Sequence, residues 1–261
     1  MNRDERIVDS DYSLRNTNIE RYKTYIGTLP EGKLTKEQLL VLELQLAERD
    51  GLSVYYIPFE YVNERAKVMV IGITPGFTQM ELAYRVARSG LHAGLTGWEI
   101  ARQAKAAASF AGTMRRNLYA MLDGIGLPES LGIDSAEALF EEERERLLHT
   151  TSAIRFPVFQ AGRNYTGHQP ELARSTFLMS FARSILLDEL ASVPGALLIP
   201  LGKSVEDVLL QFAAEGLLDP SRCLFDLPHP SGANGHRHKQ FEARKEQLAL
   251  KVSAWFAASP L

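Results

Sequence analysis

The chain has 261 residues, of which 45% are hydrophobic and 23% charged, a composition typical of a folded protein with a buried core. It contains no apolar run long enough to span a bilayer, and the polar start "MNRDERIVDSDYSLR" does not resemble a secretory signal. The single cysteine, Cys223, excludes an intramolecular disulfide and a cysteine-ligated cluster. The net charge of -3 argues against a basic surface over the whole chain. We therefore expect a cytoplasmic protein in which any DNA-binding face is a local basic patch.

Helix-like and strand-like segments alternate along the chain. The first predicted helix is "TKEQLLVLELQLAERDG", with Thr35 as N-cap and Gly51 as its end. Four apolar strands are predicted after it, in the segments "AKVMVIGITPG", "HTTSAIRFPVF", "GALLIPLG" and "RCLFDLPHPSG". Helices are predicted between and after these strands, at about residues 78–89, 97–109, 112–126, 134–149, 170–190, 203–216 and 238–257.

These strands are continuous apolar runs, which is typical of a parallel sheet covered on both faces. We predict the α/β class, with a four-stranded parallel sheet in a three-layer α/β/α domain at residues 66–261. Residues 1–65 are predicted as a helical extension packed on that core. Functional residues of such folds lie in the loops beyond the carboxyl ends of the strands.

Two of these loops carry unusual residues. "GITPG", residues 72–76, follows the first of the four strands, and its glycines permit backbone geometry and close approach that side chains would prevent. "HPSG", residues 229–232, follows the fourth strand and presents His229 from a proline-flanked turn. Each loop alone is compatible with an ordinary surface turn.

Together and in this order, the two loops resemble the first and last motifs of the uracil-DNA glycosylase superfamily. The segments "SFAGTMRRNLYAMLDGIGLP", "TTSAIRFPVFQAGRNYTGHQPEL" and "LIPLGKSVEDVLL" extend the resemblance over roughly residues 66–250. The resemblance implies a DNA glycosylase that flips a pyrimidine out of the stack and hydrolyses its bond to the sugar. It implies a monofunctional enzyme, which uses water and leaves an abasic site.

The resemblance also implies roles for individual residues. His229 would donate a hydrogen bond to the departing base, Thr74 would hold the attacking water, and Phe110 would stack on the flipped base. The other residues expected to contact the substrate are Gly72, Ile73, Pro75, Gly76, Phe77, Thr151 and Ser152. Expected DNA contacts are Ser231, Gly232, Asn234, Arg237, Lys239 and Gly112. We expect no metal or other cofactor, no membrane partner, and a monomer.

Two departures from the family pattern bear on the substrate. Thr74 stands where stronger members have Asp or Asn, so Gln79 or Glu81 would have to supply a better acceptor. Thr151 or Ser152 stands where an Asn would read uracil, and a hydroxyl cannot make the paired bonds of an amide. We therefore predict a modified pyrimidine as substrate, including a hypermodified phage cytosine, which would make this a defence enzyme.

Three alternatives remain open from the sequence. The chain could be a repair enzyme for uracil, with Asn117 or Asn164 supplying the missing amide. It could recognise DNA or a modified base without cutting, because Thr74 is a weak base. It could also hydrolyse free nucleosides or nucleotides, although the basic loop after His229 disfavours this.

Overall fold

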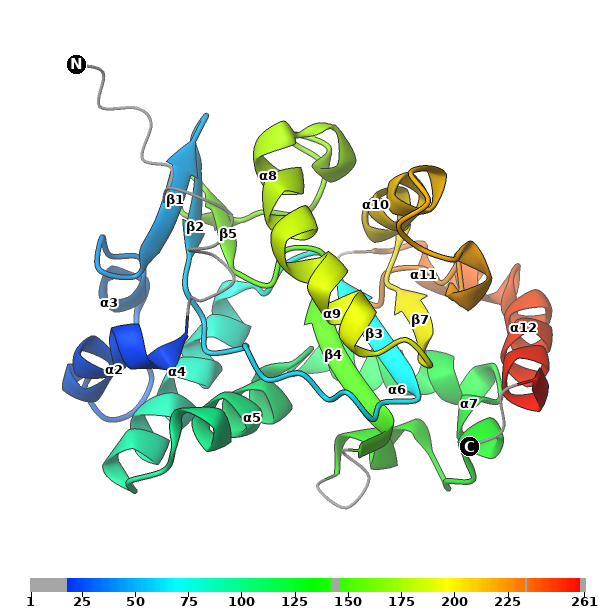
Figure 1. Cartoon of the computed structure of the whole chain (residues 1–261), viewed down its shortest axis with the longest axis horizontal. Coiled ribbons are helices and arrows are strands. Elements are labelled where there is room, and N and C mark those ends of the chain that lie inside the picture. Colours follow the sequence, from blue (N-terminus) through cyan, green and yellow to red (C-terminus); the bar gives the residue numbers. More distant parts are fainter. Residues whose placement is uncertain (1–17, 142–145, 233, 259–261) are drawn as a thin grey trace. The chain divides into compact units, whose positions relative to one another are not determined.

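The computed structural model describes residues 18–141, 146–232 and 234–258 (Figure 1). These residues form two compact units, each assembled from separate stretches of the chain. Unit 1 takes its described residues from 18–61, 74–109 and 152–188, and unit 2 from 62–73, 110–151 and 189–258. Both units draw on residues from before and after position 65, so the predicted domain boundary does not coincide with this division.

Unit 1 contains an antiparallel sheet that the sequence did not predict. Its strand order is β1-β2-β5-β6, with bounds Gln45–Arg49, Leu52–Tyr55, Val158–Gln160 and Arg163–Asn164. The N-terminal segment, predicted as a helical extension, therefore contains two strands as well as the helices α2 (Ile19–Thr28) and α3 (Lys36–Leu39). The other helical elements of unit 1 are α4 (Phe77–His92), α5 (Gly97–Ala108), η3 (Leu172–Arg174), α8 (Thr176–Phe181) and η4 (Ala182–Leu186).

The helix predicted over residues 35–51 is wrong beyond Leu39. Residues Gln45–Arg49 form strand β1 instead, which pairs antiparallel with β2 and has an irregular register between Gln45 and Ala47. Asp50 and Gly51 both have positive φ, 51° and 74°, and they join β1 to β2. An Asp-Gly pair with this geometry forms a two-residue hairpin turn, so Gly51 belongs to a turn between strands and does not end a helix.

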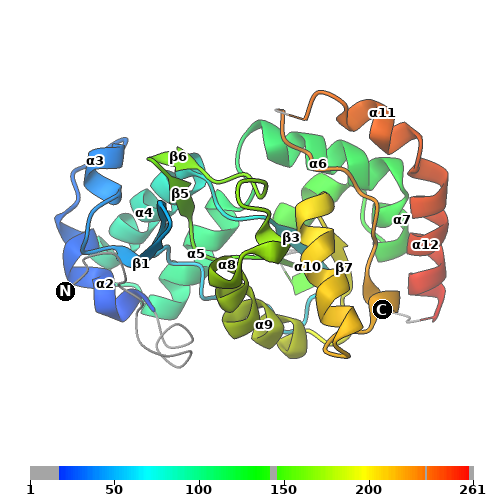
Figure 2. The same cartoon turned by 90° about the horizontal axis from the view of Figure 1, so that it is seen from above.

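Unit 2 contains a three-stranded sheet in the order β4-β3-β7, with bounds Leu148–Ser152, Val68–Gly72 and Leu197–Pro200. Strands β3 and β7 pair in parallel, with Val70 opposite Ile199. Figure 2 shows this sheet between α10 (Lys203–Ala214) on one face and α6 (Thr113–Gly124) with α7 (Leu127–Leu131) on the other. Val68 and Val70 pack with α6, α7 and α12 (Lys245–Ala258), and the alternating Met69 and Ile71 face the opposite way. The predicted α/β class is thus confirmed.

The predicted fourth strand is reduced to a single parallel bridge between Cys223 and Leu198. The Leu224 N–H donates to the Leu198 carbonyl at 2.8 Å, but Asp226 has a φ of 76° and turns the chain out of the strand conformation. The Gly202 N–H then donates to the Leu227 carbonyl at 3.0 Å. The segment before His229 therefore follows the sheet without joining it as a regular strand. The helix predicted over residues 134–149 is wrong in its extent, because the described residues there form the short helix η1 (Ala136–Phe140) and the start of β4. Unit 2 also contains η5 (Pro220–Arg222) and α11 (Arg237–Glu242), and helix α9 (Leu187–Ser192) begins in unit 1 and ends in unit 2.

Candidate active site

The histidine turn of unit 2 holds His229 in one orientation. The Ser231 N–H donates to His229 Nδ1 at 3.2 Å. A ring nitrogen that accepts a hydrogen bond carries no proton, so the proton of this neutral imidazole lies on Nε2. His229 is therefore a hydrogen-bond donor through Nε2, as its predicted role requires.

Asn117, Asn234 and Gly202 hold the backbone of this turn. Asn117, on α6, donates through Nδ2 to the Pro230 carbonyl at 2.7 Å. Asn234 donates to the His229 carbonyl at 3.3 Å. Gly202 has a φ of 81°, and a Cβ added there would lie 2.9 Å from His229 Cβ. The turn is thus clamped on two sides by amides and packs closely on a glycine.

Asn117 was considered above as an amide that reads uracil. The structure gives its Nδ2 group a backbone partner in the histidine turn instead. Asn117 and Gly202 are functional candidates that sequence reasoning did not assign to this turn. No sequence signal indicates either contact, because Asn117 and Pro230 are 113 positions apart.

The first loop links β3, which ends at Gly72, with α4, which begins at Phe77. Gly72 and Ile73 belong to unit 2, and Thr74, Pro75 and Gly76 belong to unit 1. Thr74 Oγ1 donates to the Phe156 carbonyl at 2.7 Å and accepts from the Val158 N–H at 3.1 Å. Its only proton is committed to the backbone, so Thr74 acts here as a structural link.

The turn that opens α4 is held by two amide side chains. The Gly76 N–H donates to Gln79 Oε1 at 3.0 Å, and the Phe77 N–H donates to Asn164 Oδ1 at 3.0 Å. A Cβ added to Gly76 would lie 3.0 Å from Asn164 Nδ2, so any larger residue there would require the Asn164 amide to shift. Asn164 was also considered as a uracil-reading amide, and its Oδ1 instead accepts from the start of α4.

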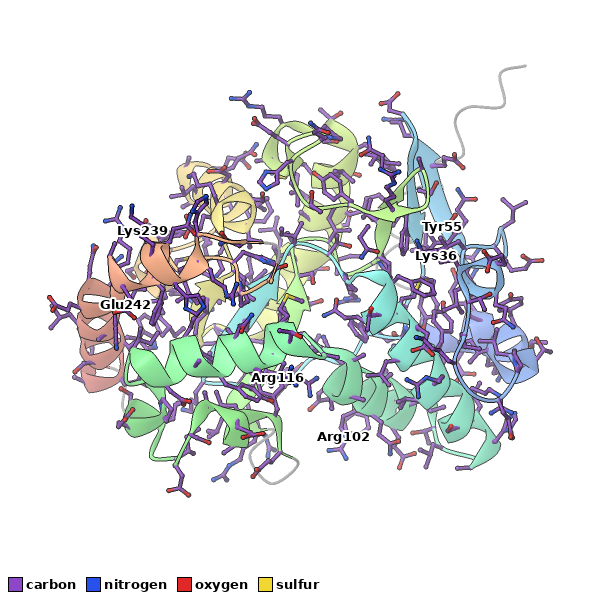
Figure 3. All side chains as sticks on the ribbon, turned by 180° about the vertical axis from the view of Figure 1, so that it is seen from behind. Lys36, Tyr55, Arg102, Arg116, Lys239 and Glu242 are labelled. Atoms are coloured by element: carbon purple, nitrogen blue, oxygen red, sulfur yellow. The ribbon has the colours of Figure 1, made fainter. Side chains whose placement is uncertain are left out.

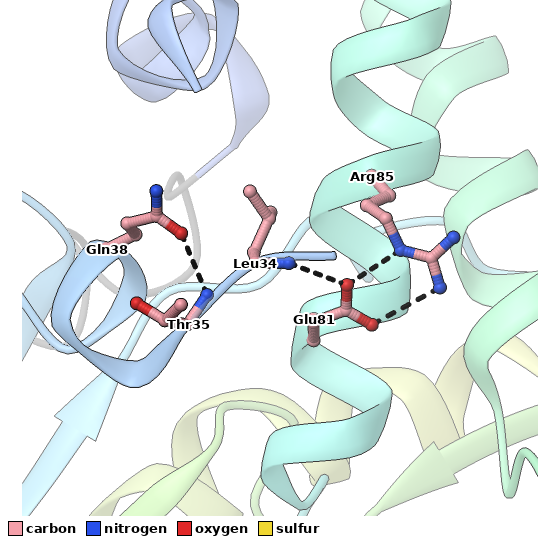
Figure 4. A network of polar contacts seen from close by, with 5 residues as sticks. All are labelled: Leu34, Thr35, Gln38, Glu81 and Arg85. Carbon is pink, nitrogen blue, oxygen red and sulfur yellow. Dashed lines mark hydrogen bonds and ion pairs between the residues drawn. The ribbon is translucent and has the colours of Figure 1, made fainter. Parts of the chain in front are cut away.

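Glu81, the second substitute considered for Thr74, has a structural role (Figure 4). Its Oε1 accepts from the Leu34 N–H at 3.0 Å, and its carboxylate pairs with Arg85 at 2.7 Å. The Glu81 residue is only 4% exposed. Its carboxylate therefore stabilises unit 1 and is not presented to a water at the loop.

Phe110 has both structural and functional features. It is 5% exposed and belongs to the hydrophobic core of unit 2 with Leu118 and Leu122. Its φ of 55° is a strained conformation for a bulky side chain, and such strain concentrates at functional sites. Gly112, two positions after Phe110, has a φ of 86° and lies directly before α6. The stacking role of Phe110 stays a prediction.

Thr151 and Ser152 lie at the carboxyl end of β4, Thr151 in unit 2 and Ser152 in unit 1. Both residues are buried, with exposures of 6% and 9%. Thr151 Oγ1 is buried and has no hydrogen-bond partner among the described residues. A buried hydroxyl without a partner costs free energy, so this atom is suited to bind a ligand group.

The expected DNA contacts lie in unit 2, Gly112 before α6 and the others after His229. Ser231, Gly232 and Asn234 form the turn, and Arg237 and Lys239 lie on α11. Arg237 is half-buried and donates to the Asn234 carbonyl at 3.4 Å, whereas Lys239 is exposed. Figure 3 shows Lys239 with Glu242 on α11 and Arg116 on α6. Arg116 is an exposed cation that the sequence analysis did not select. Position 233 lies outside the described residues.

Across the described parts of the chain, no three His, Cys, Asp or Glu side chains are grouped so that they could hold a metal ion. No helix in the same parts is long and apolar enough to cross a membrane.

The chain is similar in sequence to a known protein family. A family model described as the uracil DNA glycosylase superfamily matches residues 59–254. The uncharacterized protein YoxB of Bacillus subtilis (strain 168) is 46% identical over 241 residues, which cover 92% of this chain and 93% of that protein. The crystal structure of wild-type SMUG2 from Pedobacter heparinus has 12% sequence identity and a TM-score of 0.43. Its alignment covers 93% of this chain and 98% of the SMUG2 chain.

Proposed function

Because the chain belongs to the uracil-DNA glycosylase superfamily, we propose that it hydrolyses the N-glycosidic bond of a flipped pyrimidine in DNA. Water attacks the sugar carbon, the bond to the base nitrogen breaks, and its electron pair leaves with the base. The attacking water loses one proton to solvent, the departing base anion takes up a proton, and the products are the free base and an abasic site. This is monofunctional chemistry, because no amine of the protein is joined to the sugar. We propose that a monomer acts on cytoplasmic DNA.

The orientation of His229 is the observation that carries this proposal. A base that leaves with an electron pair develops negative charge, and a fixed N–H donor stabilises that charge without reorganising during the reaction. The hydrogen bond from Ser231 to Nδ1 leaves the ring proton on Nε2 for this purpose. The clamp formed by Asn117 and Asn234 keeps the donor in place.

We further propose that the preferred base is a modified pyrimidine, such as an enlarged cytosine of phage DNA. Thr151 and Ser152 offer hydroxyls where an amide would pair with uracil, and the Thr151 hydroxyl has no partner among the described residues. Small hydroxyl side chains leave more room than an amide does. Competition between duplexes that contain uracil and duplexes that contain hydroxymethylated or glucosylated cytosine tests this. Faster release of uracil contradicts it.

His229→Ala tests the reaction itself. We expect base release to fall by about 10²–10³-fold, the usual cost of removing one fixed donor from a site that stabilises an anion. Single-turnover release followed by alkaline cleavage measures it, and an unchanged melting temperature shows that the fold is retained. His168→Ala, at an exposed position in unit 1, is the matched control. Full activity of His229→Ala would remove this residue from the mechanism.

A second function, recognition of DNA or a modified base without cleavage, is favoured by one observation. Thr74 donates its hydroxyl proton to the Phe156 carbonyl and is a poor base for water. Under this alternative, the wild-type protein binds the modified duplex but forms no abasic sites. Release from free nucleosides, measured in parallel, separates the reaction on DNA from hydrolysis of nucleosides.

A further inference from the structure

The first loop of unit 1 has few oxygen atoms that could orient an attacking water. A water becomes a better nucleophile when an acceptor holds one of its protons. Thr74 is unsuited to this, because its hydroxyl is bonded to Phe156 and Val158. The amide and carboxylate side chains that contact the turn or follow it closely in α4 are those of Asn164, Gln79 and Glu81.

Burial separates these three acceptors. Gln79 and Glu81 are 7% and 4% exposed, and both oxygens of Glu81 already have donors within unit 1. Asn164, in contrast, is exposed to solvent. It is therefore the one of the three that a water molecule can reach directly.

The side chain of Asn164 is also held firmly in place. Strand β6 fixes its backbone, where Asn164 pairs with Phe159 of β5. The Phe77 N–H bonds to Oδ1, and the Nδ2 group packs over Gly76, where a Cβ would lie 3.0 Å away. An amide oxygen accepts two hydrogen bonds, so Oδ1 retains capacity for a water after it has accepted from Phe77.

We propose that Asn164 orients the attacking water, a role that the threonine at position 74 does not fill. This inference rests on the hydrolysis proposed above. In that reaction Asn164 lowers the barrier of the chemical step, and it contributes little to the affinity for DNA.

Asn164→Ala and Asn164→Asp test the proposal. Removal of the acceptor is expected to lower kcat by about 10²-fold, the lower end of the range for a group that positions or accepts a proton. The dissociation constant for an uncleavable duplex should not change. Asn164→Asp keeps an acceptor for the Phe77 N–H, so it should fold normally and release the base near neutral pH. Its rate should then fall as pH drops and the new carboxyl protonates, a loss that the wild type does not show.

Two controls separate this role from a structural one. Gln79→Ala removes the neighbouring hydrogen bond of the same turn, and Gln160→Ala changes an exposed residue of the same hairpin. If Asn164 only supports the turn, Asn164→Ala and Gln79→Ala should lower kcat equally, and Asn164→Asp should follow the pH profile of the wild type. Either of these two results overturns the role of Asn164. The proposed hydrolysis is still supported in that case, provided that the wild-type protein releases the base. An inactive wild type overturns both.

Discussion

At the scale of single residues, hydrogen-bond partners decide which side chains are able to act. Thr74 and Asn164 belong to the same small region of unit 1, but the threonine hydroxyl is committed to the backbone and the exposed asparagine retains an acceptor. In unit 2, the hydrogen bond from the Ser231 N–H sets the tautomer of His229. The partners of Thr74 and Asn164 do not follow from sequence spacing, because they lie 82 and 87 positions away along the chain.

Glu60 provides a prediction about pH at this scale. Its Oε1 accepts from the Ile19 N–H at 2.6 Å and from the Tyr56 hydroxyl at 2.8 Å, and its Oε2 is buried without a partner among the described residues. Burial raises the pKa of the Glu60 carboxyl above its ordinary value, although these donors and the charge of Arg155 oppose the rise. Glu60 therefore favours the folded state most when it is protonated, and this contribution is lost as pH rises through the elevated pKa.

We expect the melting temperature of Glu60→Gln to rise relative to the wild type as pH increases from acidic to neutral, because glutamine cannot ionise. Glu99→Gln is the control with the opposite sign. The N–H and hydroxyl of Thr96 lower the pKa of the exposed Glu99 carboxyl, so its stabilising contribution is present above its unfolded pKa. Its replacement should therefore reduce stability at neutral pH and matter less in acid. If the melting temperatures of Glu60→Gln and the wild type change in parallel with pH, the raised pKa of Glu60 is contradicted.

At the scale of elements, the sequence predicts well what local pattern determines. Strand β3 and helices α4, α5 and α6 lie where apolar runs, periodicity and flanking glycines place them. The antiparallel sheet was missed because β1 and β2 belong with β5, a segment about a hundred positions later in the chain that pairs with β2. The fourth strand was overcounted because an apolar run does not reveal that Asp226 adopts a positive φ.

Helix α10 offers a prediction at this scale, because it has a glycine with positive φ near each end. Gly202 precedes the helix with a φ of 81°, and Gly216 follows it with a φ of 72°. A Cβ at Gly202 would lie 2.9 Å from His229 Cβ, whereas a Cβ at Gly216 would meet nothing within 4 Å. Gly216→Ala should therefore cost only the backbone strain, about 1 kcal/mol.

Gly202→Ala should cost more stability than Gly216→Ala, because the His229 turn must move as well. It should also lower the rate of base release, whereas Gly216→Ala should leave that rate unchanged. Denaturant unfolding and single-turnover assays measure the two effects. Equal stability losses with full activity in both variants would show that the histidine turn does not depend on close packing against Gly202.

At the scale of the whole molecule, charge determines how the protein would bind DNA. The net charge of -3 opposes the approach of a polyanion, so affinity must come from local cations. In unit 2 the exposed cations near the histidine turn in sequence include Lys239 on α11, with Arg237 half-buried two residues earlier. A phosphate contact by each would release counterions and make binding depend on salt.

We expect Arg237→Ala combined with Lys239→Ala to weaken DNA binding and to reduce the slope of log affinity against log salt by about 0.9 for each phosphate that the variant no longer neutralises. The reduction should be similar for modified and unmodified duplexes, because phosphate contacts carry no base information. Lys251→Ala, at an exposed position of α12, is the matched control for removal of a charge. Titrations over a range of salt concentrations, with His229→Ala as background so that the duplex is not cleaved, give the slopes. A double variant with the same slope as that background would show that these two cations make no phosphate contact.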